Sequence, residues 1–153
     1  MDNRAIALKL ILDHLETADI STVEQRMEVQ KAIYLVQSTG MPLGYSYGWY
    51  LKGPYSPTLT RDYYSLGDEG GMQNATLKAS AIGKLDNLKE LINQPIGGLG
   101  RPHRLELLAS LHYLIKNSRF SEDKARQRIR ETKSHLADHV TAGLAALRGH
   151  GLL

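Results

Sequence analysis

The sequence predicts a mostly helical fold with a small β element, and three observations lead to this prediction. Apolar residues recur at helical spacing along most of the 153-residue chain. The segment 45–51 is instead rich in tyrosine and contains the single tryptophan, which is typical of a strand or one arm of a hairpin. Glycine, proline and capping residues separate the periodic segments, so they indicate where one helix ends and the next begins.

The first half predicts helices on both sides of one strand. The expected elements, in order, are a helix over 3–16, a helix over 22–39, the strand over 45–51, a helix over 57–66, a loop over 67–71 and a short wing strand over 73–79. In the segment Gly53-Pro54-Tyr55-Ser56-Pro57, the glycine and first proline end the extended run. Ser56 is a predicted N-cap and Pro57 suits the first helical position. Helix, helix, strand, helix and wing follow one another in the order of a winged-helix fold.

The second half predicts helices alone. Helices are expected over 81–93, 103–116, 122–133 and 139–148, with a Gly/Pro-rich linker over 94–102. Ser121 and Asp138 are predicted N-caps. The last three helices resemble a second helix-turn-helix unit, so the chain divides into a winged-helix-like lobe over 1–79 and a helical lobe over 80–153. One compact domain is the alternative.

Two motifs carry a resemblance to known proteins. Gln30, Lys31, Tyr34 and Leu35 stand on the second predicted helix, and the Gly53-Pro54-Tyr55-Ser56-Pro57 turn follows the strand. This arrangement resembles the Panacea (SocA-like antitoxin) domain and a related YwgA-like group of winged-helix proteins. Lys52 departs from the Panacea pattern, which more often has tyrosine before Gly-Pro. The resemblance implies a winged-helix fold and an antitoxin-like role that depends on binding a protein such as a toxin.

Composition argues against several classes of protein. The chain has no cysteine, which excludes a thiol nucleophile, a disulfide framework and cysteine-ligated zinc. It shows no signal peptide and no apolar run near 18 residues, so we expect a cytoplasmic protein without membrane association. His135 and His139 stand four residues apart, but no third ligand accompanies them in the sequence. Because no nucleophile elbow or P-loop is present either, we expect no enzyme activity, metal or cofactor.

Charge is distributed unevenly and suggests a polyanion or an acidic protein as partner. Residues 1–76 contain six Lys/Arg and nine Asp/Glu, whereas residues 77–153 contain thirteen and seven. Arg126, Arg130 and Lys133 fall on one side of a predicted helix, with Arg119 nearby, which favours contacts with a nucleic-acid backbone. A solvated helix face is the alternative. The residues expected to contact duplex DNA are Lys52, Arg61, Arg119, Arg126, Arg130, Lys133, Thr141 and Arg148.

The aromatic residues allow a second interpretation. Tyr45, Tyr47 and Trp49 alternate along the predicted strand and are expected to face the core. An exposed groove around Trp49, Tyr55 and Tyr64 would instead bind a protein partner, because tyrosine and tryptophan are common interface anchors. We therefore predict a non-enzymatic DNA-binding or regulatory protein, with an antitoxin-like or adaptor module as the alternative and a homodimer as a further option for the alanine-rich last helix.

Overall fold

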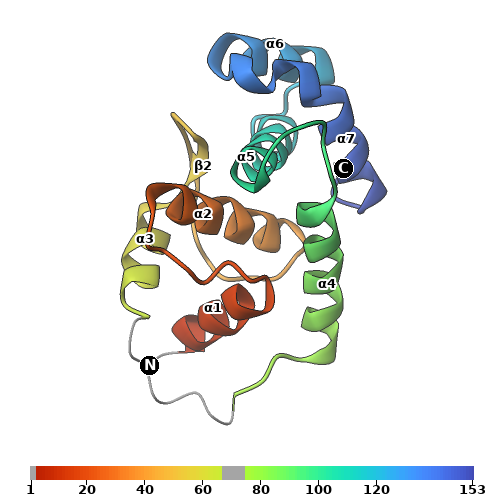
Figure 1. Ribbon diagram of the computed structural model, residues 1–153. Coiled ribbons are helices and arrows are strands. Elements are labelled where there is room, and N and C mark those ends of the chain that lie inside the picture. The colour runs from red at the N-terminus through yellow and green to blue at the C-terminus, as the bar shows by residue number, and fades with distance from the viewer. Residues whose placement is uncertain (1–2, 67–74) are drawn as a thin grey trace.

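The computed structural model describes residues 3–66 and 75–153 and shows a mostly helical fold with a two-stranded antiparallel sheet (Figure 1). The elements are α1 (Asn3–His14), α2 (Val23–Ser38), β1 (Gly48–Tyr50), β2 (Gly53–Tyr55), α3 (Pro57–Tyr64), α4 (Ala79–Asn93), α5 (Arg101–His112), the π-helical turn η1 (Tyr113–Asn117), α6 (Glu122–Thr132), the 3₁₀ helix η2 (Ser134–His139) and α7 (Val140–Gly149). The mostly helical class with a small β element is thereby confirmed.

Helices α2 and α5 pack against each other at the centre of the fold. All residues of 29–36 on α2 and of 105–112 on α5 are buried, so each helix is covered on every side along these runs. Helices α4 and α7 also contact α5 (Figure 1). The buried apolar residues form one cluster to which both predicted lobes contribute.

The sheet is a short hairpin that lies beside α2 and α5. Trp49 pairs with Pro54 and Tyr50 pairs with Gly53, leaving Leu51 and Lys52 at the turn. The predicted strand over 45–51 is shorter than expected, because residues 45–47 are not in the sheet. Tyr45 is nevertheless buried, and Tyr47 and Trp49 pack against the core, as the alternation predicted.

Helix caps follow the sequence closely. Ser56 Oγ accepts a hydrogen bond from the backbone N–H of Leu59, and Ser121 Oγ accepts one from that of Lys124. Pro57 occupies the first turn of α3. The prediction that Asp138 caps the last helix is wrong, since α7 begins at Val140 and His139 occupies the N-cap position without a side-chain bond.

The predicted wing strand over 73–79 is not formed by its described part. Residues 75–78 have no regular structure, and Ala79 already begins α4. Residues 73 and 74, and the predicted loop at 67–71, lie outside the described residues.

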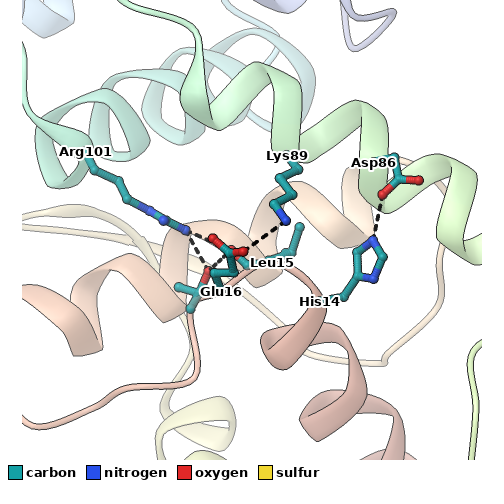
Figure 2. A network of polar contacts seen from close by, with 7 residues as sticks. His14, Leu15, Glu16, Asp86, Lys89 and Arg101 are labelled. Carbon is teal, nitrogen blue, oxygen red and sulfur yellow. Dashed lines mark hydrogen bonds and ion pairs between the residues drawn. The ribbon is translucent and has the colours of Figure 1, made fainter.

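A polar network joins the end of α1 to α4 and α5 (Figure 2). His14 Nε2 lies 2.7 Å from Asp86 Oδ1, and Lys89 Nζ lies 3.2 Å from Glu16 Oε1. Arg101 Nη2 donates to the Leu15 carbonyl at 3.0 Å. These contacts lie away from the hairpin and hold segments that are more than seventy residues apart in sequence.

Candidate functional site

Two buried lysines hold the hairpin by its backbone. Lys31 Nζ on α2 donates to the Pro54 carbonyl at 2.7 Å, and Lys133 Nζ donates to the Leu51 carbonyl at 2.8 Å. Each lysine is only 1% exposed. Burying an ammonium group is costly unless acceptors replace water, so these two carbonyls are strong anchors for the turn.

Burial, together with the charges of Lys133 and Lys52, lowers the pKa of Lys31 to about 7 against the opposing effect of Glu106. The only hydrogen-bond acceptor that the described residues give Lys31 Nζ is Pro54. Since the Lys31 side chain is almost fully buried, this carbonyl is its anchor within the fold.

Lys133 belongs to a charged network with α5 and η2. Its Nζ lies 2.8 Å from Glu106 Oε2, while Glu106 Oε1 lies 3.2 Å from His135 Nε2. Burial opposes ionisation of Glu106, but hydrogen bonds and charges from Lys133 and His135 outweigh it and lower the pKa of this carboxyl. Lys133 Nζ also lies 5.4 Å from the centre of the Trp49 ring.

Gln30 joins the two sequence motifs. Its Oε1 accepts from the Ser56 backbone N–H at 2.8 Å, and its Nε2 donates to the Ser56 carbonyl at 3.0 Å and to Thr60 Oγ1 at 2.9 Å. The amide is buried and fully used, so its role is to fix the start of α3 against α2. With Lys31 on Pro54, the Gln-Lys pair thus positions the Gly-Pro-Tyr-Ser-Pro turn.

Apolar side chains surround the anchored turn and remain exposed. Leu51 is 87% exposed, Val23 is 64% exposed and Tyr50 is 50% exposed. Two adjoining hollows, of about 250 Å³ and about 170 Å³, share Met27 and Lys52 in their walls. We call this surface the hairpin groove and define it by Val23, Met27, Lys31, Tyr50, Leu51, Lys52 and Tyr55.

The basic residues predicted to contact DNA do not form one surface. Arg61 lies on α3, at the left of Figure 1, Lys52 at the hairpin turn, and Arg126 and Arg130 on α6 at the top, away from α3. Arg119 and Thr141 are exposed. Arg148 forms an ion pair with Glu122.

Lys133 does not share the exposed basic face of α6, and that prediction is wrong. Helix α6 ends at Thr132, and the backbone of Lys133 leaves the helical region with φ −143° and ψ 58°. The side chain consequently turns into the protein, where it binds Glu106 and the Leu51 carbonyl. Its ammonium is unavailable to a phosphate.

The aromatic residues predicted to bind a partner lie in different places. Trp49 is half-buried, with its ring centre 5.7 Å from that of Tyr113. Tyr55 lines the hairpin groove and makes an edge-to-face contact with Tyr50 at 5.2 Å. Tyr64 is exposed but stands on α3 beside Tyr63, outside the groove.

A third hollow, of about 290 Å³, is lined by residues from the C-terminal half of α2, among them Tyr34 and Ser38. His112 Nδ1 in its wall lies 2.7 Å from the hydroxyl of Tyr34, which also accepts from Asn117 Nδ2 at 3.3 Å. Burial and the charge of Lys116 lower the pKa of His112 to about 4. The buried histidine is thus paired within the fold and neutral at pH 7.

Sequence reasoning missed several residues of the hairpin groove. Val23, Met27, Tyr50 and Leu51 were not identified as a surface, because their proximity depends on how the hairpin packs on α2. One signal was present: Lys31 interrupts an apolar run on α2, and a lysine in such a run needs a buried partner.

Comparisons with known proteins identify no family for this chain: no protein-family model, curated protein or solved structure gives a significant match. The resemblance to Panacea and YwgA-like proteins therefore stays a prediction. Within residues 3–66 and 75–153, no helix has both the length and the apolar character needed to cross a membrane.

Proposed function

We propose that this chain is a non-enzymatic binding module that holds a protein partner in the hairpin groove. The observation that carries the proposal is the apolar turn at Leu51, which is almost fully exposed although its backbone is fixed by Lys133. An exposed apolar side chain on a fixed backbone loses little conformational freedom on binding, which favours affinity. Single exposed apolar residues are common on surfaces, but Val23, Tyr50 and Leu51 border the same pair of hollows.

The chemistry of the groove favours a partner segment that combines apolar and acidic residues. Lys31 and Lys52 line the larger hollow, and no carboxylate shares its wall. The remaining lining is apolar or aromatic, apart from Gly53. A carboxylate in the groove would pair with the ammonium group of Lys52, whose side chain is exposed. This mode agrees with the antitoxin-like or adaptor role that the resemblance implies.

A second candidate function is binding of duplex DNA by a winged-helix-like arrangement that uses α6. Arg119, Arg126 and Arg130 form no ion pair among the described residues, and they leave positive charge for phosphates. Arg148 is neutralised by Glu122, and the exposed face of α7 is otherwise Thr141, Ala142 and Ala145. This face offers few groups that read bases. The proposal for DNA therefore concerns weak binding to the backbone.

The test is a selection from a random peptide library displayed on phage, followed by affinity measurement on synthetic peptides. We expect enriched peptides to contain an acidic residue beside apolar residues and to bind the wild-type chain. Leu51→Asp should abolish binding, since it places a charge on the apolar turn without disturbing the core. Tyr64→Asp is the matched control, because Tyr64 is also an exposed apolar side chain, 56% accessible, but lies outside the groove.

Three outcomes would contradict the proposal. The library could yield no enriched peptide, the enriched peptides could bind the Leu51→Asp variant as well as the wild type, or the Tyr64→Asp variant could be the one that loses binding. The last outcome would move the partner site to α3.

A further inference from the structure

We propose that His103, Glu106 and His135 form a binding site for one divalent cation of the zinc class. This inference is independent of the proposed function, because all three ligands belong to this chain and no partner is needed to form the site. Each residue offers one ligand atom, and the three atoms lie within 4.8 Å of one another. The site differs from the His135 and His139 pair, which was set aside in the sequence for want of a third ligand. The His139 ring instead lies close to Gly97.

The ligand set is the first argument for zinc. Two imidazoles and one carboxylate are a common set for Zn²⁺, and similar sets bind other late divalent transition metals. Mg²⁺ and Ca²⁺ prefer oxygen ligands and should bind poorly here. The three ligands therefore favour Zn²⁺ over Mg²⁺ and Ca²⁺, whatever occupies the fourth coordination position.

The geometry requires only small movements. His103 and Glu106 stand one turn apart on α5, and η2 brings His135 to them, with the two imidazole centres 5.1 Å apart. Bonds of 2.0–2.2 Å to a tetrahedral zinc ion place neighbouring ligand atoms about 3.4 Å apart. Both histidines are exposed, so their rings can rotate towards the carboxylate without disturbing the core.

Glu106 is already prepared to act as a ligand. Lys133 holds its Oε2 at 2.8 Å, which fixes the carboxylate and leaves Oε1 directed towards His135. A cation would take Oε1 in place of that hydrogen bond. The positive charge of Lys133 opposes the cation, and Lys52 lines the adjoining hollow, so we expect micromolar rather than nanomolar affinity.

The site is open on one side. His103 and Glu106 form part of the wall of the hollow of about 170 Å³, together with Glu24. Three protein ligands and an open side leave a coordination position for water or for a donor from another molecule.

Isothermal titration of chain free of any affinity tag with ZnCl₂ tests this site. We expect one equivalent to bind and Mg²⁺ to bind at least about a hundredfold more weakly. Zinc affinity should fall at least about tenfold in the His103→Ala/His135→Ala variant. His139→Ala is the matched control, since it removes an imidazole from the same element, η2, and should bind zinc as the wild type does.

A measurement on the wild-type chain identifies the ligands without any substitution. NMR spectra should show zinc-dependent shifts of the imidazole resonances of His103 and His135, with those of His139 unchanged. Equal zinc affinity in the double variant, loss of affinity in His139→Ala, absence of a one-to-one binding event, or shifts centred on other histidines would overturn the assignment.

Discussion

Lys31 and Lys133 are both buried lysines that hold backbone carbonyls of the hairpin. Each lysine joins the hairpin to a segment distant in sequence, since Lys31 donates to the Pro54 carbonyl and Lys133 to the Leu51 carbonyl. An apolar residue in either position would leave a carbonyl without its donor. The hairpin turn is therefore fixed by two residues of a type that is almost never fully buried unless it is paired.

Lys31 makes stability depend on pH in a specific direction. Its pKa falls from 10.5 in the unfolded chain to about 7 in the fold, so the unfolded chain binds the extra proton between these values. The free energy of unfolding should therefore rise with pH above 7, by about 2 kcal/mol between pH 7 and pH 9 from this residue alone. Urea denaturation of wild type and Lys31→Met at both pH values measures the effect. An equal rise in the two proteins would contradict it.

Substitution by alanine should destabilise the fold strongly at Lys133 and hardly at all at Arg130. Lys133→Ala leaves Glu106 buried without its strongest partner, so we expect a loss of about 3–5 kcal/mol in stability. Arg130→Ala removes an exposed side chain and should change stability by less than about 0.5 kcal/mol. Thermal or urea denaturation compares the two variants. A silent Lys133→Ala would show that the side chain is exposed in solution.

The turn from β2 into α3 is the element most tightly specified by its residues. Gly53 has φ +98°, and a Cβ there would lie 2.5 Å from Ser110 Oγ. Ser56 caps α3, while the buried side chains of Leu59 and Tyr63 pack this helix against the core. Each of these residues contributes to the same junction for a different physical reason.

Three substitutions separate those contributions. Gly53→Ala should cost about 1–3 kcal/mol through backbone strain and the contact with Ser110. Ser56→Ala should cost about 1 kcal/mol through the lost cap, and Tyr63→Ala about 3 kcal/mol or more, since this ring is buried. Equilibrium denaturation gives all three values. A Tyr63→Ala variant as stable as the wild type would contradict the burial of that ring.

Helix positions were predictable where periodicity and caps agree, as for α2 and α6. The end of α6 was not, because Lys133 continues the charge pattern although its backbone leaves the helix. Contacts such as Gln30 with Ser56 and Glu106 with His135 depend on tertiary packing, so no local pattern indicates them. The hairpin groove was missed for the same reason.

For the whole molecule, the DNA proposal makes a separate prediction. Random duplex DNA should bind weakly and lose affinity steeply with salt, and Arg126→Ala/Arg130→Ala should reduce that affinity while stability stays unchanged. Fluorescence anisotropy at low and physiological salt, with melting curves for both proteins, measures this. No binding at low salt would eliminate DNA as a partner of α6.

An NMR shift map of the isotope-labelled chain with a peptide selected from the library would locate the partner site residue by residue. We expect the largest backbone shifts to fall on Val23, Met27 and residues 50–55, around the turn that Lys31 and Lys133 hold. Shifts centred on α6, or on Tyr64 in α3, with the hairpin unchanged, would contradict this expectation.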